Sequence, residues 1–89
     1  MLSNYPNPFN PSTTIEFSIP INSKVEILVF NVQGQKVKTL LRELLPKGKH
    51  QVIWNGNDIT GKPVSSGIYF YKLSVNGKAG SIKKCLLSK

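Results

Sequence analysis

The sequence predicts an all-β fold, an antiparallel β-sandwich of about seven strands. Short alternating apolar runs recur along the chain, turn residues separate them at near-regular intervals, and no segment has a convincing long helical pattern. The 89 residues are enough for one domain, 1–89, with one thin core. A content of 39% hydrophobic and 18% charged residues is typical of a folded domain rather than of a disordered tail.

The first two strands are expected before residue 31. Ile15, Phe17 and Ile19 alternate with polar residues, which is the period of a half-buried strand. The segment 24–30, KVEILVF, has apolar residues on both of its faces. A strand that is apolar on both faces is typical of the middle of a sheet, so we expect 24–30 to be a central strand.

The next two strands are less clearly marked. KVKTLLRELL, residues 36–45, fits both a helical and a strand pattern. We favour a strand for its first half, because an isolated helix of this length would be marginal and the neighbouring strands need a partner. After a proline and a glycine, KHQVIWN at 49–55 predicts another strand, with Val52 and Trp54 on one face.

The last third of the chain contains a long loop and a hairpin. Residues 55–66, NGNDITGKPVSS, are almost entirely turn formers, with room for a short strand at Pro63–Val64. GIYFYKLSV, residues 67–75, has the strongest strand pattern in the chain. Asn76–Gly77 is a hairpin signal and predicts a final strand within 78–88.

One motif makes the predicted sandwich immunoglobulin-like. In SGIYFY, Tyr69 follows Gly67 by two residues and precedes another core position. This matches the tyrosine corner, in which a tyrosine hydroxyl hydrogen-bonds to the backbone a few residues upstream. The fold class we expect is therefore an Ig-like antiparallel β-sandwich of about seven strands.

The charge is strongly basic but dispersed. Twelve Lys and Arg against four Asp and Glu give a net charge of +8, which would suit nucleic acid or an anionic surface because binding releases counterions. The basic residues are spread along the chain and mostly alternate with apolar ones, as on the solvent faces of strands. We favour a solvated face over nucleic-acid binding, and leave open an acidic partner such as lipopolysaccharide or another protein.

The sequence contains no group of residues that predicts catalysis or a metal site. GNDITGKP fits a phosphate-binding loop until Pro63, which stands where such a loop needs Ser or Thr, and a strand rather than a helix follows. The single histidine, His50, is expected to be exposed and cannot form a triad or a multi-histidine site alone. We therefore predict no catalytic residue, no metal, no cofactor and no small-molecule substrate, and hence no enzyme.

Several conspicuous residues are assigned structural roles. Asp58 lies among turn formers and is expected to form an Asx turn. Cys85 lies among apolar residues and is expected to be a buried small hydrophobe rather than a reactive thiol. Trp54, Tyr69 and Tyr71 are expected in the core, the alternative being an exposed platform on which a sugar ring stacks.

The order of five sequence blocks resembles a known family. They are NYPNPFNPSTTIEFSIP, VEILVFNVQGQKVKTLL, LPKGKHQVIWNGND, GKPVSSGIYFYKL and IKKCLLSK, which together cover essentially the whole chain. In this order they closely resemble the type A C-terminal sorting domain of the type IX secretion system. The middle and late blocks also resemble the Ig-like domain of flagellar hook-capping proteins.

The resemblance implies a non-catalytic sorting signal carried at the C-terminus of a larger protein. An N-terminal cargo in cis would cross the inner membrane by its own signal peptide, and the outer-membrane translocon would then recognise the domain. A surface sortase usually removes such a domain and attaches the cargo to anionic lipopolysaccharide. The implied localisation is secreted, or at the outer-membrane surface of a Gram-negative bacterium, via the periplasm.

The resemblance also marks candidate residues for translocon or sortase recognition, in three motifs: Pro6, Asn7 and Pro8; Gly67 and Tyr69; and Lys84, Leu86 and Leu87. Cys85 departs from the family, which more often has a larger apolar residue there. Because Met1 precedes the first motif by only three residues, we expect the chain to be a domain excised from a longer protein, without its cargo and cleavage site.

The proline-rich segment 1–12 raises two expectations. Because proline fixes φ and cannot donate to a sheet ladder, Pro6, Pro8 and Pro11 are expected to hold the entering chain extended, out of helix and central strand, and without ladder pairing. Such a segment would keep the junction between cargo and sandwich accessible. The alternative is that the prolines protect an edge strand from pairing with another chain.

Two other functions are kept as alternatives to sorting. A structural module of the hook-cap type would assemble with copies of itself or with a filament. A carbohydrate-binding sandwich would use Trp54 or Tyr71 as an exposed stacking surface.

Overall fold

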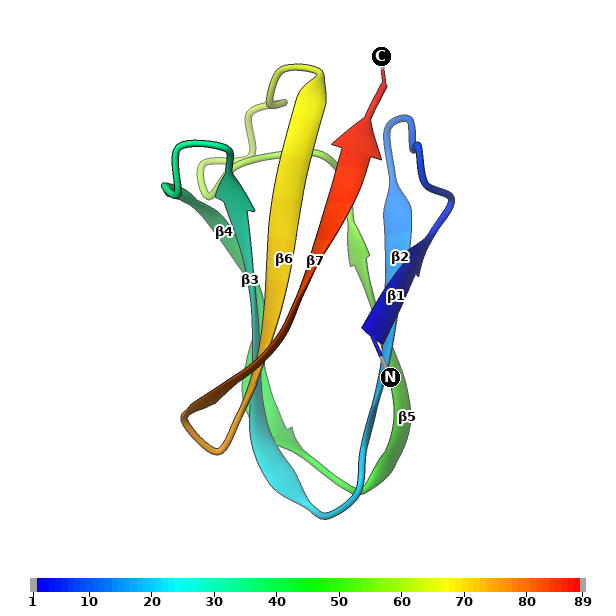
Figure 1. Ribbon diagram of the computed structural model, residues 1–89, viewed down its shortest axis with the longest axis vertical. Helices are drawn as coiled ribbons and strands as arrows, with labels where there is room; N and C mark the ends of the chain where they lie inside the picture. Colours follow the sequence, from blue (N-terminus) through cyan, green and yellow to red (C-terminus); the bar gives the residue numbers. More distant parts are fainter. Residues whose placement is uncertain (1, 89) are drawn as a thin grey trace.

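Two antiparallel sheets form the molecule, and the computed structural model describes residues 2–88 (Figure 1). The smaller sheet has the order β1-β2-β5 and contains β1 (Leu2–Tyr5), β2 (Thr13–Ile19) and β5 (Gly48–Trp54). The larger has the order β4-β3-β6-β7 and contains β3 (Ser23–Asn31), β4 (Lys36–Leu45), β6 (Gly67–Val75) and β7 (Lys78–Leu87). The predicted all-β antiparallel sandwich of about seven strands is confirmed. Residues 2–88 contain no helix that is long and apolar enough to span a bilayer.

The β3 strand occupies the centre of the larger sheet, as its two apolar faces predicted. Val25, Ile27 and Val29 point inward and are fully buried, while Leu28 and Phe30 alternate with them and point outward. The β4 strand covers the whole ambiguous segment, so the strand expected for its first half extends through the second. Pairing along the edge of β3 outweighs the helical pattern of the segment, although two register shifts interrupt the pairing.

The β1 strand was not predicted. Leu2–Tyr5 pairs with β2 in a continuous register, from Leu2 opposite Phe17 to Tyr5 opposite Thr14. The expectation of an entrance without ladder pairing is therefore wrong for residues 2–5, although β1 is an edge strand and not a central one. The prolines follow this edge strand and lie in the connection between β1 and β2.

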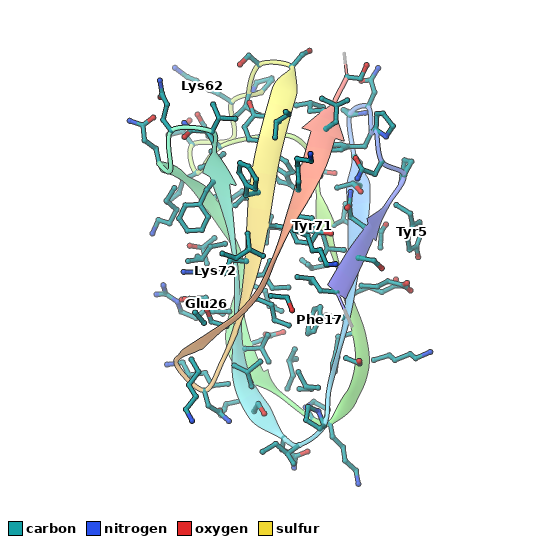
Figure 2. The ribbon with its side chains drawn as sticks, in the orientation of Figure 1. Tyr5, Phe17, Glu26, Lys62, Tyr71 and Lys72 are labelled. Atoms are coloured by element: carbon teal, nitrogen blue, oxygen red, sulfur yellow. The ribbon has the colours of Figure 1, made fainter. Side chains whose placement is uncertain are left out.

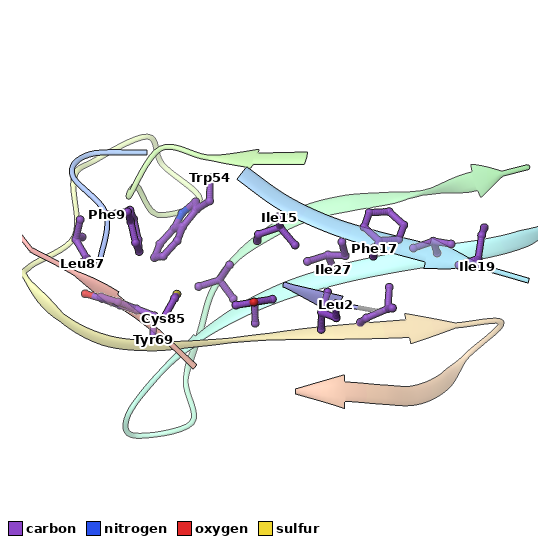
Figure 3. Packing of buried hydrophobic residues seen from close by; sticks show 14 residues of the cluster. Leu2, Phe9, Ile15, Phe17, Ile19, Ile27, Trp54, Tyr69, Cys85 and Leu87 are labelled. Carbon is purple, nitrogen blue, oxygen red and sulfur yellow. The ribbon is translucent and has the colours of Figure 1, made fainter. Parts of the chain in front are cut away.

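The core lies between the two sheets and is closed at one end by aromatic rings (Figure 3). Trp54 lies between Phe9 and Tyr69, with ring centroids 5.4 and 5.2 Å away. The Tyr69 hydroxyl donates to the Ser65 carbonyl at 2.6 Å, which is the predicted tyrosine corner. Trp54 and Tyr71 are 0% and 1% exposed, so a sugar-stacking surface on these rings is ruled out.

The loop after β5 behaves largely as expected. Asp58 accepts hydrogen bonds from the Thr60 hydroxyl, the Thr60 N–H and the Lys62 N–H, which confirms the Asx turn. The Thr60 hydroxyl is the largest cause of a lowered pKa of the Asp58 carboxyl. Pro63 forms only an isolated bridge with Asn57, so the short strand proposed at Pro63–Val64 does not form.

The single histidine is less exposed than expected. His50 is half-buried, because its ring stacks on Phe17 with centroids 5.6 Å apart. Its Nε2 lies 2.7 Å from the Pro46 carbonyl oxygen. The prediction of an exposed His50 is therefore wrong, and the side chain has a packing role at the edge of the smaller sheet.

Candidate functional site

All three candidate motifs meet at one corner of the sandwich, which we call the loop–β7 corner. It consists of the β1–β2 connection at 6–12, the start of β6 and the end of β7. Figure 1 shows this connection beside the C-terminal end of β7, although the two segments are almost the whole chain apart. The structure thus brings the first motif next to the last one.

Three hydrogen bonds hold the connection on the outer edge of β7. The Phe9 N–H donates to the Leu86 carbonyl at 2.9 Å, and the Ser88 N–H donates to the Phe9 carbonyl at 2.9 Å. The Asn7 side chain accepts from the Leu86 N–H at 3.0 Å through Oδ1. Phe9 and Leu87 consequently form a parallel bridge, and the end of β7 is bonded on both sides.

The middle motif lies on the other side of β7. In the β6–β7 register, Gly67 is opposite Leu87, Ile68 is opposite Leu86, and Tyr69 is opposite Cys85. The start of β6, the end of β7 and the β1–β2 connection are therefore three adjacent segments of one surface.

The candidate residues divide into a buried and an exposed group. Tyr69 and Leu87 are buried and support the corner from inside. Five candidates reach the surface: Pro6, Asn7, Pro8, Lys84 and Leu86. Gly67 is half-buried. Asn7, Ile68, Lys84, Cys85 and Leu86 line a shallow hollow of about 190 Å³ at this surface.

Three residues that shape the corner were missed by the sequence reasoning. Phe9 is 2% exposed and is the apolar anchor of the proline-rich connection; its position as the one apolar residue among prolines and asparagines was a usable sign. The Thr13 hydroxyl donates to the Pro6 carbonyl at 2.9 Å and accepts from the Asn4 amide at 3.0 Å. Gly56 packs beneath the connection, and nothing local in the sequence indicates that contact.

Replacing Gly56 with alanine should loosen the corner. A Cβ at this position would meet the Pro11 carbonyl oxygen at 2.9 Å and the Leu87 side chain at 3.5 Å, and Gly56 has a φ of +70°. We expect a loss of about 2–3 kcal/mol in the free energy of unfolding, measured in urea. Gly61→Ala is the matched control, because Gly61 has a φ of +87° and no atom within 4 Å of a built Cβ. It should cost only the backbone strain, about 1 kcal/mol. Equal losses in the two variants would contradict the packing role of Gly56.

The confirmed burial of Cys85 predicts a pH dependence of stability. Burial raises the pKa of the Cys85 thiol from 9.0 to about 12. Burial, with the nearby Cys85 as a smaller cause, raises the pKa of the Tyr71 hydroxyl from 10.0 to about 12. The unfolded chain therefore loses these protons first, and the free energy of unfolding should fall as the pH rises from about 9 towards 12. In a Cys85→Ala variant the contribution that begins near pH 9 should be missing. Identical pH profiles for the two proteins would refute this assignment.

The described part of the loop–β7 corner contains no cluster of side chains that would support catalysis or metal binding. Among residues 2–88, no three His, Cys, Asp or Glu side chains lie together in a way that could hold a metal ion. The corner instead offers a fixed surface of proline, amide, lysine and leucine groups.

Solved structures with the same fold include two Por proteins of Porphyromonas gingivalis. The chain is 19% identical to dimeric latent PorU, with a TM-score of 0.80 over 97% of this chain and 9% of that chain. It is 17% identical to PorZ, an essential bacterial surface component of the type IX secretion system, with a TM-score of 0.61 over 99% of this chain and 11% of that one. The chain thus spans only about a tenth of either protein.

A third structure with this fold has a different role. Pseudomonas fluorescens alkylpurine DNA glycosylase AlkC, solved with DNA that contains an abasic site analogue, is 20% identical, with a TM-score of 0.58 over 100% of this chain and 29% of that one. At these identities the likeness of all three structures shows the fold alone.

The family assignment comes from the sequence match over almost the entire chain. The family model of the secretion system C-terminal sorting domain matches residues 3–88. No curated protein sequence matches the chain. The resemblance to type IX sorting domains is confirmed by the family match, and the fold agrees with it. The chain therefore belongs to the family of secretion system C-terminal sorting domains.

Proposed function

We propose that this domain directs an N-terminal cargo across the outer membrane, and that the type IX translocon recognises it at the loop–β7 corner. The observation that carries the proposal is the direct contact between the first and last motifs. Asn7 and Phe9 hydrogen-bond to Leu86 from the far end of the chain. A recognition surface built this way exists only in the folded domain, so it would mark a folded cargo fusion as ready for export.

Membership of the sorting-domain family implies export to the cell surface or to the outside of the cell. The route through the periplasm and the removal of the domain by a surface sortase are parts of our proposal. We take the domain as the substrate of these steps rather than as a catalyst, because its family is one of sorting signals.

The geometry of β1 supports a cargo in cis. Figure 1 shows the N-terminal end of β1 pointing away from the loop–β7 corner. A cargo that precedes residue 2 would therefore leave Pro6, Pro8 and Leu86 accessible to the translocon. The edge position of β1 also ties the junction to the sandwich through the β2 ladder.

The test is a secretion assay in a host that has the type IX system. A fluorescent cargo with an inner-membrane export signal is fused to residues 1–89 and followed in wild-type and translocon-null cells. We expect the cargo at the surface only in wild-type cells, and the mass of the released cargo would locate the processing site. Equal periplasmic retention of the folded fusion in both strains would overturn the proposal.

A further inference from the structure

The outward faces of the two sheets differ in chemistry. On the smaller sheet, the outward side chains of Tyr5, Glu16 and Gln51 form one polar cluster. Gln51 Nε2 donates to Glu16 at 3.0 Å and to the Tyr5 hydroxyl at 3.3 Å, and the Tyr5 hydroxyl lies 3.5 Å from Glu16. The polar side chains of this cluster hydrogen-bond to one another, as is common on the solvent-exposed face of an antiparallel sheet.

The outward face of β3, β6 and β7 is apolar instead. The register places Phe30 beside Phe70, and Leu28 beside Lys72, which in turn lies beside Ile82. Ile68 lies beside Leu86 in the same face. We define the apolar face by the six apolar side chains of these rows: Leu28, Phe30, Ile68, Phe70, Ile82 and Leu86.

Three members of the apolar face are strongly exposed. Ile82 is 59% exposed, Ile68 is 41% and Leu86 is 39%. Figure 2 shows Lys72 on the outward side of this sheet, whereas Tyr71, its neighbour in β6, points between the two sheets. Contiguous exposed apolar side chains of this kind commonly mark an interaction surface, whereas single ones do not.

The charged side chains of this face that lack an ion-pair partner among residues 2–88 are positive. Lys72 Nζ lies 5.4 Å above the Phe30 ring, and Lys84 lines the hollow next to Leu86. The acid on this face, Glu26, is paired with Arg42 at 2.6 Å. Within residues 2–88, neither lysine of the face has a carboxylate in salt-bridge distance. A partner whose surface is complementary to this face is therefore apolar and carries carboxylates.

This charge pattern discriminates between possible occupants. A second copy would bring Lys72 and Lys84 against the same lysines of a molecule whose own net charge is +8. An anionic membrane is usually recognised by a cluster of four or more basic residues. Three lysines border the apolar face, with Lys36 beside Phe30, Lys72 beside Leu28 and Lys84 beside Phe70. The arginine on this side, Arg42, is already paired with Glu26. A protein surface with an apolar anchor and nearby carboxylates fits both features.

We infer that the apolar face is a docking surface for a protein of the export machinery that presents an apolar side chain bordered by Asp or Glu. The apolar side chain occupies the hollow between Ile68 and Leu86, and a carboxylate pairs with Lys84. This inference rests on the proposed function and extends the loop–β7 corner, which shares Leu86 and Lys84 with the apolar face, across the outer side of the larger sheet.

The test compares two isoleucines with the same exposure on opposite sheets. Ile82 is 59% exposed on the apolar face, and Ile53 is 58% exposed on the smaller sheet. In the fluorescent cargo fusion, Ile82→Glu should lower the initial rate of surface arrival by roughly tenfold, as expected for the most exposed side chain of the apolar face, while Ile53→Glu should leave it unchanged. Lys84→Glu and Lys49→Glu provide a second matched pair, because both lysines are exposed on strands.

Thermal unfolding of the four variants shows whether each domain is folded. Equal export of the Ile82→Glu and Ile53→Glu fusions, with the wild-type fusion exported normally, would overturn the docking inference and leave the proposed function standing. Failure of the wild-type fusion itself to reach the surface would overturn both. If Ile82→Glu is unfolded, the export rates of the Lys84→Glu and Lys49→Glu fusions are compared instead, and equal rates would overturn the docking inference.

Two measurements on the purified domain test the other occupants. At 150 mM NaCl we expect a monomer by light scattering, and vesicles of phosphatidylglycerol should bind wild type and Ile82→Glu to the same extent. A stable dimer that Ile82→Glu dissociates would identify a second copy as the occupant. Vesicle binding that is lost in Ile82→Glu but kept in Ile53→Glu would identify a membrane. Either result would overturn the inference that a protein of the export machinery docks on the apolar face.

Discussion

Replacing Phe9 with alanine should lower the free energy of unfolding by about 3–4 kcal/mol. The side chain is 2% exposed and packs on Trp54, whose ring centroid is 5.4 Å away. Its removal would leave a cavity beneath the β1–β2 connection, next to Leu87 (Figure 3). For a domain of this size such a loss is a large part of the roughly 5–15 kcal/mol that folded proteins typically have.

The measurement is urea unfolding followed by the fluorescence of Trp54. Ile53→Ala is the control, because this isoleucine is exposed and should change stability by less than about 0.5 kcal/mol. Hydrogen exchange should also show faster exchange of the Leu86 and Ser88 amides in Phe9→Ala, since both are bonded to the connection. A loss below about 1 kcal/mol would mean that Phe9 does not anchor the corner.

The alternating pattern was enough to predict most of the fold. A strand with a strict period of two, such as β2 from Ile15 to Ile19, has its apolar positions buried and its polar positions outside, because alternate side chains of a strand point to opposite faces. The tyrosine corner at Tyr69 and the Asx turn at Asp58 were also predictable, since each depends on residues within four positions in the sequence.

The features that the sequence did not show depend on partners far along the chain. The β1 strand has four residues and one buried side chain, Leu2, so its strand pattern is too short to recognise. Its pairing with β2 supplies the missing information. His50 was predicted to be exposed because the ring of Phe17, on the neighbouring strand, could not be placed from the sequence.

In the candidate site, too, local motifs could be predicted from the sequence, whereas contacts between distant segments could not. The family resemblance marked the three motifs, but only the structure shows that Asn7 bonds to Leu86, 79 positions away. Gly56 and Thr13, which contact the connection, belong to none of the three motifs. Contacts between two segments that lie far apart in the sequence produce no periodic apolar pattern in either segment, so the sequence alone did not reveal them.

Removing residues 83–89 from the cargo fusion should reduce surface delivery by at least tenfold, and we expect the cargo to remain periplasmic. The deletion removes Lys84 and Leu86 from the surface and Cys85 and Leu87 from the core. It also leaves Asn7 and Phe9 without their bonding partner on β7. Surface delivery that is unchanged by the deletion would contradict the sorting role of the final strand.

Two substitutions at the end of β7 separate recognition from folding in that result. Leu87 is fully buried, so Leu87→Ala should destabilise the domain by about 2–4 kcal/mol and affect export only through folding. Leu86 is 39% exposed, and its bonds to Asn7 and Phe9 use backbone atoms that Leu86→Ala retains. Leu86→Ala should therefore unfold at nearly the wild-type urea concentration yet lower the rate of surface arrival. If Leu86→Ala is exported at the wild-type rate while Leu87→Ala is not, the deletion acts through stability, and the exposed side chains of the final strand are not what the translocon reads.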